Sequence, residues 1–476
     1  MKVLYAASEV LPFSSSGGLG DVIGALPKAL KKTHEDYDVR VISPLYSAVR
    51  EEYRKRMKKE KEFTVKLSWR KIYCAVYSLE ENGVVYYFVD NEYYFKRDSL
   101  YGNFDDGERF AYFSAAVLTF MDQLDFFPDV MNCNDWQTAL AVINIKTKYA
   151  IDRRYASVKT VFSIHNILFQ GQYDHAVSGD VFDLDRRYFE IYDFNGQINL
   201  MKGAIVCADR VVTVSEKYAQ EIMTPEFANG LDPIIRMYSC KLSGILNGID
   251  YAYYDPSKDT AIARNYTFRS VGRKAENKTA LQAELGLPVR ADVPMISVIS
   301  RLTDQKGVDL IKERAEELLY DDVQFVLLGC GDRYYEDFFR DLQYRRSDKV
   351  RAIIAYDKDL SKRIYASSDI FLMPSKTEPC GLSQMIASRY GAVPVVRETG
   401  GLYDSIKPYH IEGGVPVGNG FTFTYYNSGD MLYVIREALG LYRDKEAFKA
   451  LTVKIMKHDF SWSVSAEKYA ELYNSI

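Results

Sequence analysis

The sequence predicts an α/β protein with two domains, each built on a parallel sheet. Short apolar runs typical of buried strands alternate with amphipathic helical patterns along most of the chain. This alternation stops in the polar stretch 251–277 and starts again beyond it. The chain has 476 residues, too many for one hydrophobic core. We therefore expect two Rossmann-like domains that face a central cleft.

Composition excludes several classes of function. The formal net charge of -4 gives no positive field for nucleic acid or an anionic membrane. The six cysteines form no CxxC pair and have no cluster of histidines beside them, which is typical of a reduced compartment and indicates no metal site. The apolar run 3–7 is too short for a signal peptide, and no run approaches membrane-spanning length. We expect a cytoplasmic protein with no membrane or nucleic-acid partner.

The first strand-turn-helix unit lies at the start of the chain. Residues 3–7 predict a buried strand and residues 22–30 a helix, with a glycine-rich turn at 17–20 between them. Such a corner can cradle a phosphate, although the glycines can also serve a tight turn alone. Ile23 stands where the third glycine of a dinucleotide fingerprint would be, and no GxxxxGK[ST] motif exists. Dehydrogenase and P-loop functions are therefore not indicated.

Further strands and one long helix complete the first domain. Apolar runs predict strands at 39–44, 84–90 and 158–164, and a stripe of apolar residues predicts a core-facing helix at 108–124. The run of charges at 54–62 predicts a solvated helix face or a loop.

Polar residues follow several of these strands. His165 comes directly after the strand 158–164, where a structural and a functional role are both open. Asp135 lies near a strand end and could face the cleft. The loop 91–98 interleaves aromatic and charged residues, which could line a sugar-binding surface. No arrangement of the five histidines suggests a Ser-His-Asp triad or a metal cage.

The second domain repeats the strand-to-helix rhythm. Its strands are predicted at 294–300, 323–329, 352–356, 370–374 and 393–397. Arg301 and Lys306 lie on one strand-to-helix turn and can converge on a diphosphate, Arg through its planar fork and Lys as a point charge. A surface salt bridge is the alternative for this pair. Tyr356, at a strand end, could stack on a nucleobase.

The stretch 374–384 combines a strand end, one carboxylate and the start of a helix. Free backbone N–H groups at Cys380, Gly381 and Ser383 could hold a phosphate or a sugar hydroxyl. Because a carboxylate repels phosphate, Glu378 would accept hydrogen bonds from ligand hydroxyl groups. The alternative is that Glu378 only caps the helix.

The end of the chain predicts a helix that docks through one apolar face. Trp462, Ala466, Tyr469 and Tyr473 share that face. We expect an N-terminal domain at 1–246, a C-terminal domain at 247–458, and a final segment 459–476 whose helix crosses back to the N-terminal domain.

Many short motifs, in one order, resemble those of one family. The chain resembles bacterial glycogen synthases and plant starch synthases, which are retaining GT-B glucosyltransferases of glycosyltransferase family 5. The matching motifs are Ser8-Glu9, Gly17 to Val22, Tyr93 to Asp98, Phe104 to Phe110, Asn134 to Trp136, His165-Asn166, Phe194 to Ile198, Leu246 to Gly248, Lys274 to Lys278, Ser300 to Leu302, Gln305 to Gly307, Glu378 to Leu382, Thr399 to Leu402 and Phe460 to Trp462.

The resemblance implies transfer of glucose from a nucleotide-glucose, most simply ADP-glucose, to the non-reducing end of an α-1,4-glucan, with no cofactor and no metal. It implies catalytic roles for Glu378, His165, Arg301 and Lys306. It implies donor binding by Ser15, Gly17, Gly18, Asp135, Asn247, Tyr356, Cys380, Gly381, Leu382 and Ser383. It implies acceptor binding by Glu9, Tyr93, Tyr94 and Arg97. No residue pair supplies a nucleophile and a base, which suits a same-face mechanism in which the leaving phosphate helps to deprotonate the acceptor.

The chain departs from the family pattern at three places. Ser15-Ser16 replaces the usual Lys-Thr before the first glycines, so a donor-contacting lysine is missing. Lys376-Thr377 replaces Arg-Phe, and Asn132 replaces a common histidine. Lys376 could compensate for the missing lysine. The alternatives are a GT-B enzyme with another donor, such as UDP-glucose, or another acceptor, and a catalytically weak paralogue that binds glucan or regulates an active synthase.

Overall fold

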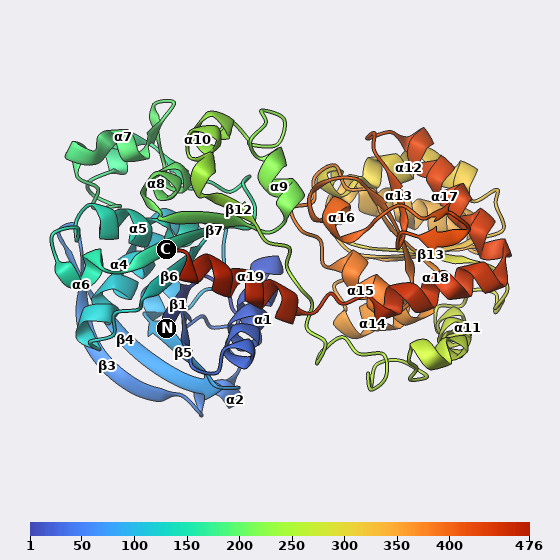
Figure 1. Ribbon diagram of the computed structural model, residues 1–476, viewed down its shortest axis with the longest axis horizontal. Helices are drawn as coiled ribbons and strands as arrows, with labels where there is room; N and C mark the ends of the chain where they lie inside the picture. The colour runs from blue at the N-terminus through green and yellow to red at the C-terminus, as the bar shows by residue number, and fades with distance from the viewer. The chain divides into compact units, whose positions relative to one another are not determined.

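The computed structural model describes residues 1–476, which divide into two compact units. Unit 1 consists of Met1–Gly248 together with Trp462–Ile476, and unit 2 consists of Ile249–Ser461. Figure 1 shows unit 1 mainly in blue and green, with the red final helix, and unit 2 in yellow to red. Each unit has its own sheet and its own core.

Unit 1 is built on a nine-stranded sheet in the order β12-β11-β7-β6-β1-β2-β5-β4-β3. The pairs from β12 to β5 are parallel, whereas β4 runs antiparallel to both β5 and β3. The strands are β1 Lys2–Ala6, β2 Asp38–Pro44, β3 Lys58–Leu67, β4 Arg70–Glu81, β5 Val84–Asp90, β6 Val130–Asn134, β7 Lys159–Ile164, β11 Arg210–Thr213 and β12 Leu242–Gly244. A small second sheet holds β8 Gln172–Tyr173, β9 Asp193–Phe194 and β10 Gln197–Asn199.

The helices of unit 1 include the last helix of the chain. They are α1 Gly18–Thr33, α2 Glu51–Arg54, α3 Glu92–Phe95, α4 Asp106–Gln123, α5 Trp136–Lys146, α6 Arg153–Ala156, α7 Phe189–Tyr192, α8 Leu200–Cys207, α9 Glu216–Glu221, α10 Asp232–Met237 and α19 Trp462–Asn474, with 3-10 turns at His175–Val177, Arg186–Tyr188 and Ser239–Lys241. Helix α19 packs against α1, and Figure 1 shows the red and blue helices side by side. Its apolar face, Trp462 to Tyr473, is buried in the core of unit 1.

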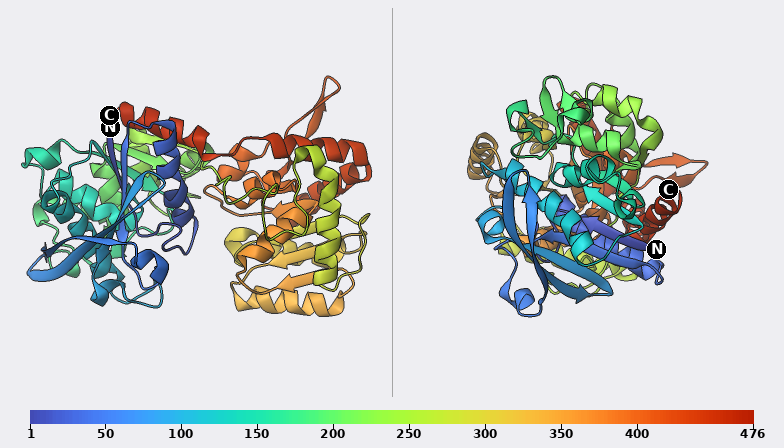
Figure 2. Two further views of the ribbon diagram at one scale, coloured as in Figure 1. Left: turned by 90° about the horizontal axis from the view of Figure 1, so that it is seen from below. Right: turned by 90° about the vertical axis from the view of Figure 1, so that its left-hand side faces the viewer.

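Asn132, where the family resemblance leads us to expect a histidine, belongs to this packing. It is buried on β6, and its amide donates to the Tyr473 hydroxyl at 2.8 Å. The Tyr473 hydroxyl in turn contacts the Tyr5 hydroxyl at 3.0 Å, which ties α19 to β1. The two ends of the chain therefore lie on the same side of unit 1, as Figure 2 shows.

The charged run 54–62 differs from its prediction. A helix face or a loop was expected, whereas residues 58–62 form the first half of β3, the outermost strand of the sheet. Lysine and glutamate side chains there lie mostly in solvent. Charged residues on an edge strand discourage pairing with another chain, which gives this run a structural reason.

Unit 2 is built on a six-stranded sheet in the order β15-β14-β13-β16-β17-β20, parallel throughout. The strands are β13 Met295–Ile299, β14 Gln324–Leu328, β15 Val350–Ile353, β16 Ile370–Met373, β17 Val393–Arg397 and β20 Phe421–Phe423, with a separate hairpin of β18 His410–Glu412 and β19 Val415–Val417. Both views of Figure 2 show this hairpin standing away from the rest of unit 2. The predicted α/β class with parallel sheets is confirmed.

The helices of unit 2 cover its sheet and carry most of its core together with the strands. They are α11 Lys274–Glu284, α12 Val308–Leu318, α13 Arg333–Arg345, α14 Lys358–Ser367, α15 Ser383–Arg389, α16 Gly400–Ser405, α17 Ser428–Arg443 and α18 Lys445–Lys457, with 3-10 turns at Phe268–Arg273 and Asp304–Lys306. None of the helices in either unit combines the length and the apolar character that crossing a membrane requires.

Candidate active site

The candidate residues of unit 1 gather at the carboxyl ends of neighbouring parallel strands. Strand β6 ends at Asn134, and β7, its neighbour, is followed at once by His165. Asn134 Oδ1 and His165 Nε2 lie 2.9 Å apart. The side chains of these two strand ends are therefore joined, in the place where parallel sheets bind ligands.

The hydrogen bonds of Asn134 determine which nitrogen of the His165 ring carries the proton. The amide nitrogen of Asn134 donates to the Ala6 carbonyl at 3.0 Å, so its oxygen faces the ring and accepts from Nε2. Burial lowers the pKa of His165 to about 4, and the imidazole is neutral at pH 7. With the proton on Nε2, the Nδ1 atom is left as a hydrogen-bond acceptor. Such an atom suits a sugar hydroxyl.

Asp135 holds the backbone beside this ring. Its carboxylate accepts the N–H of His165 at 2.8 Å and also accepts a hydrogen bond from the backbone of Asn166. Asp135 itself has a positive φ of 55° and opens α5. Burial nevertheless raises the pKa of Asp135 to about 7, because desolvation outweighs the two backbone hydrogen bonds. The carboxylate thus serves to position His165.

The substitution Asp135→Asn is expected to stabilise the protein at alkaline pH more than at acid pH. The native state binds a proton at Asp135 more tightly than the unfolded state, so the stability of the natural protein falls as pH rises from about 4 to about 7. Asparagine keeps an oxygen for the His165 N–H but carries no charge. The stability gain should grow by roughly 1 to 3 kcal/mol between pH 5 and pH 8.

Thermal midpoints of the two proteins at pH 5 and pH 8 measure this effect. The lowered pKa of His165 reduces stability below about pH 6, but it does so in both proteins and cancels in the difference. Asp36→Asn, at an exposed position, serves as the matched control with no pH-dependent gain. An equal difference at both pH values would contradict the buried-charge explanation.

The carboxylate of Glu9, which is predicted to contact the acceptor, lies against the first glycine loop. One oxygen accepts the N–H of Ser16 at 2.6 Å and that of Gly17 at 3.2 Å, while the other accepts the Ser16 hydroxyl at 2.8 Å. Glu9 is buried, whereas residues 15–18 are exposed. Of the loop N–H groups, that of Gly18 opens α1, where the first N–H groups have no partner within the helix.

The three residues of the 93–97 segment that are predicted to bind the acceptor have different surroundings in the structure. Tyr93 is 71% exposed, and its ring is available at the surface. Tyr94, also expected to contact the acceptor, is 2% exposed, and its hydroxyl donates to Glu108, so it packs in the core. Arg97 pairs with Asp105 at 2.8 Å and donates to the Tyr93 carbonyl.

Arg109, which was not predicted to have a role, stabilises the backbone of this segment. Its guanidinium is fully buried, donates to the Tyr94 carbonyl at 2.7 Å and pairs with Asp106. The sequence signal that could have indicated its role is an arginine directly before the apolar residues 110–113.

Asn247 is buried, and its side-chain oxygen has no hydrogen-bond partner in the protein. A ligand hydroxyl would satisfy that oxygen.

Five of the candidate residues of unit 2 line one pocket of about 200 Å³. It lies at the carboxyl ends of two neighbouring strands, β13 and β16, and at the start of α15. Ser300 and Pro374, which directly follow these strands, form part of its wall. Lys306, Glu378, Gly381, Leu382 and Ser383 line it as well, as the sequence had suggested for a ligand-binding turn.

An ion pair joins the two turns of this pocket. Lys306 Nζ donates to Glu378 Oε2 at 2.6 Å, with both side chains largely buried. The Ser375 hydroxyl donates to the same oxygen at 3.1 Å. Since both partners use Oε2, the second oxygen of Glu378 remains for a ligand. The side chain of Glu378 does not cap α15, which begins after Leu382 without a side-chain cap.

Glycines allow the turns around Glu378 to pack closely. Gly307 has a φ of 70°, and a Cβ there would meet the Pro374 carbonyl oxygen at 2.1 Å. At Gly401, a Cβ would lie 2.0 Å from the Cys380 carbonyl oxygen, and its N–H donates to Glu378 O at 3.1 Å. The glycine turn at 399–402 therefore supports the backbone of the Glu378 turn.

The remaining predicted residues of unit 2 lie around the pocket rather than in its wall. Arg301 follows Ser300 directly and is exposed. Tyr356, beyond the end of β15, is 81% exposed. Cys380 is buried and does not form part of the pocket wall. Ser375, which the sequence analysis did not assign, lines the pocket and holds Glu378. No group of three or more His, Cys, Asp or Glu side chains is placed to hold a metal ion.

Both parts of the chain match models of known families. Residues 2–237 match the starch synthase catalytic domain, and residues 286–450 match group 1 of the glycosyl transferases. A glycogen synthase from Clostridium perfringens is 50% identical over 478 residues, covering 100% of this chain and 98% of that protein. A glycogen synthase from Anoxybacillus flavithermus is 48% identical, with the same coverage.

Solved structures agree with these sequence matches. The catalytic domain of starch synthase IV from Arabidopsis thaliana, bound to ADP and acarbose, has a TM-score of 0.91 and 34% identity, covering 99% of this chain and 98% of that chain. A sucrose-phosphate synthase from Thermosynechococcus elongatus has a TM-score of 0.61 at 14% identity, covers 100% of this chain and 98% of that chain, and shares the fold alone. The chain has the GT-B fold and belongs to the glycogen synthase and starch synthase family of glycosyltransferases.

Proposed function

We propose that this glycosyltransferase transfers glucose from ADP-glucose to the 4-hydroxyl at the non-reducing end of an α-1,4-glucan, with retention of configuration. The bond between C1 of glucose and the phosphate oxygen breaks, and ADP leaves with the electron pair. The acceptor hydroxyl bonds to C1 from the same face, and its proton passes to the leaving phosphate. The solved starch synthase IV was bound to ADP and acarbose, which supports an adenine nucleotide and a glucan-like acceptor.

The pocket of unit 2 supplies the groups for the donor. Lys306 and Arg301 stabilise the negative charge that develops on the departing diphosphate. An ammonium group has three donors, so Lys306 can keep its bond to Glu378 and still contact a phosphate oxygen. The free oxygen of Glu378 accepts glucose hydroxyl groups. Tyr356 stacks on the base, and backbone N–H groups from Gly381 to Ser383 add donors, with Cys380 directly before them in the chain.

The residues of unit 1 act on the sugar and the acceptor. Nδ1 of His165 accepts a glucose hydroxyl near the reacting carbon, and Asp135 keeps the histidine in place. The unpaired oxygen of Asn247 supports the sugar pocket. Tyr93 offers its exposed ring to the acceptor chain, with Arg97 beside it. Gly17 and Gly18 present the first loop to the donor, and Glu9 holds that loop in shape.

One observation carries the proposal. Lys306 and Glu378, 72 residues apart in the chain, form an ion pair in the wall of one pocket at the carboxyl ends of two parallel strands. A cation for phosphate beside a carboxylate for hydroxyl groups is the pair of functions that a nucleotide-sugar requires. The six free cysteines support action in the cytoplasm, where thiols stay reduced.

Release of nucleoside diphosphate tests the function and the donor together. The purified protein is incubated with ADP-glucose or UDP-glucose, each with and without a short maltooligosaccharide, and the glucan products are sized. Acceptor-dependent release from ADP-glucose with chain lengthening is expected. Faster release from UDP-glucose would show that UDP-glucose, and not ADP-glucose, is the preferred donor. Glucan binding without release from either donor would favour a weak paralogue, the alternative that Ser15 raises.

The substitution Ser15→Lys is expected to tighten donor binding by about ten- to a hundredfold. A charged hydrogen bond to phosphate contributes about 1.5 to 3 kcal/mol, and the loop around Ser15 is exposed, so a longer side chain fits. The KM for ADP-glucose measures the change. Ser15→Met, similar in length but uncharged, is the matched control and should give no gain. An unchanged KM in Ser15→Lys would mean that other cations already neutralise the diphosphate.

A further inference from the structure

A second pocket of unit 2 lies at the opposite edge of the same sheet. Its volume is about 240 Å³, and its wall includes Asp292, Asp369 and Gly391, which precede strands β13, β16 and β17. The donor pocket lies at the other ends of β13 and β16, since Pro374 follows the strand that Asp369 precedes. The second pocket, which we call the amino-edge pocket, is therefore a separate site.

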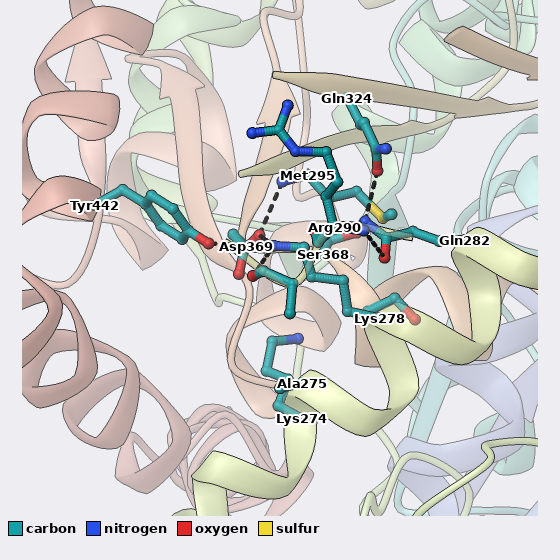
Figure 3. A network of polar contacts seen from close by, with 12 residues as sticks. Lys274, Ala275, Lys278, Gln282, Arg290, Met295, Gln324, Ser368, Asp369 and Tyr442 are labelled. Carbon is teal, nitrogen blue, oxygen red and sulfur yellow. Dashed lines mark hydrogen bonds and ion pairs between the residues drawn. The ribbon is translucent and has the colours of Figure 1, made fainter. Parts of the chain in front are cut away.

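Both carboxylates of the amino-edge pocket are paired with cations. Asp369 Oδ2 accepts from Lys278 Nζ at 2.7 Å, and Lys278 also contacts the Tyr442 hydroxyl at 3.1 Å. Figure 3 shows Lys278 reaching from α11 toward Asp369 and Tyr442. Asp292 pairs with Arg290 at 3.1 Å, and Arg290 also pairs with Asp322 at 2.9 Å. Each carboxylate in the wall therefore already has a cation partner.

Three further lysines of this pocket have no carboxylate partner. Lys445 and Lys449 come from the first two turns of α18, and neither forms an ion pair. The ammonium group of Lys445 lies 3.3 Å from the ring centre of Tyr442, another residue of the pocket wall. Burial lowers the pKa of Lys445. A bound anion would raise this pKa again, because a negative charge nearby favours the protonated amine. Asp444, beside it, accepts the Ala447 N–H as the cap of α18.

The third lysine, Lys274, is buried beneath the pocket. Its amino group donates to the carbonyl groups of Tyr365, Ala366 and Tyr390 at 2.8 to 3.1 Å. These carbonyls belong to the ends of α14 and α15, so Lys274 holds two helix termini. Burial lowers the pKa of Lys274 to about 7. Figure 3 shows this side chain rising from α11 into the region below Asp369.

From Lys445 and Lys449, which have no carboxylate partner, we propose that the amino-edge pocket binds a compact phosphomonoester. A phosphate dianion would balance the positive charge of these two lysines, whereas the three N–H donors of Lys274 are already taken by carbonyl groups. The volume of the pocket falls below the roughly 300 to 1,000 Å³ of pockets that take drug-sized ligands. It exceeds the space of a bare phosphate, so the ligand carries a small body, such as a hexose, against Phe448.

Calorimetric titration of the intact protein tests the proposal with ADP held at saturation. The donor pocket is then occupied, and heat from a hexose monophosphate reports binding elsewhere. The probes are a hexose monophosphate, inorganic phosphate and the unphosphorylated hexose. We expect the hexose monophosphate to bind at least tenfold more tightly than inorganic phosphate and the neutral hexose not to bind. Loss of binding in the presence of ADP would overturn the separate site, and equal binding of the two phosphates would overturn the assigned class.

Variants of α18 place the ligand in the amino-edge pocket. Lys445→Gln combined with Lys449→Gln should weaken the hexose monophosphate Kd by about a hundredfold or more, since each removes a charged contact. Lys454→Gln, on the same helix but outside the pocket wall, is the matched control and should keep the natural Kd. Both lysines of the double variant are exposed, so the protein should fold normally. An unchanged Kd in the double variant would refute the site.

Discussion

The substitution Glu378→Ala is expected to lower the rate of glucose transfer by about a thousandfold or more while ADP still binds. Glu378 is the carboxylate of the unit 2 pocket proposed to bind the donor, and its free oxygen is the group proposed to hold the glucose hydroxyls. Removing one well-placed electrostatic contact to a transition state lowers rates by about a hundred- to a thousandfold. Loss of sugar positioning adds to that effect.

Binding of ADP separates this explanation from a general collapse of the pocket. In the variant, Lys306 loses its carboxylate partner, and its ammonium group becomes more available to phosphate. The Kd for ADP should therefore stay the same or decrease, and circular dichroism should be unchanged. Glu398→Ala is the control, because Glu398 also follows a strand but contacts Thr422 and Thr424 outside the pocket. A rate within tenfold of the natural protein would remove Glu378 from its assigned role.

Many of the parallel strands could be predicted because each is a short apolar run between polar residues, whereas β4 and β20 were not predicted. Val84–Asp90 and Ile370–Met373 are found where the pattern placed them. The charged run 54–62 was misread because its strand is an edge strand, whose pairing with β4 leaves most of its first residues in solvent. Alternation between core and solvent, on which the prediction relies, is weak in such a strand.

The candidate site could be predicted only as far as strand ends bring residues together. Lys306 and Glu378 were each predicted at a strand-to-helix turn, but only the structure shows that their strands are neighbours and that the two side chains share one pocket. That Glu9 would turn to the loop 16–17 could not be predicted, because the contact depends on the path of an exposed turn. The burial of Tyr94 beside exposed Tyr93 has another cause, because successive side chains of the short helix α3 point about 100° apart and only that of Tyr94 faces the core.

The pKa values of the site depend on burial, which sequence does not show. Asp135 and His165 were each predicted to lie at a strand end, and the structure shows that the Asp135 carboxylate accepts the His165 N–H. The raised pKa of Asp135 and the lowered pKa of His165 arise because both groups are withdrawn from water. The proton on Nε2 follows from the orientation of Asn134, a residue quoted in a motif but given no role.

The substitution Lys306→Gln is expected to weaken ADP binding by about ten- to a hundredfold and to lower the transfer rate by about a thousandfold. The variant removes the cation of the donor pocket and leaves the carboxylate of Glu378 without its 2.6 Å partner. The unpaired carboxylate then repels the diphosphate, so binding and catalysis fail together. Titration with ADP and steady-state release of ADP measure the two losses.

Comparing ADP binding by Lys306→Gln and by Glu378→Ala tests whether Lys306 acts on the phosphate and Glu378 on the sugar. If Lys306 acts on phosphate and Glu378 on sugar, Lys306→Gln weakens ADP binding and Glu378→Ala does not, although both abolish transfer. Lys312→Gln, on α12 with its amino group over the Tyr334 ring, controls for loss of a nearby positive charge and should change neither quantity by more than a fewfold. Equal ADP binding by Lys306→Gln and the natural protein would show that Lys306 only supports Glu378, and Arg301 would then be the main cation for the diphosphate.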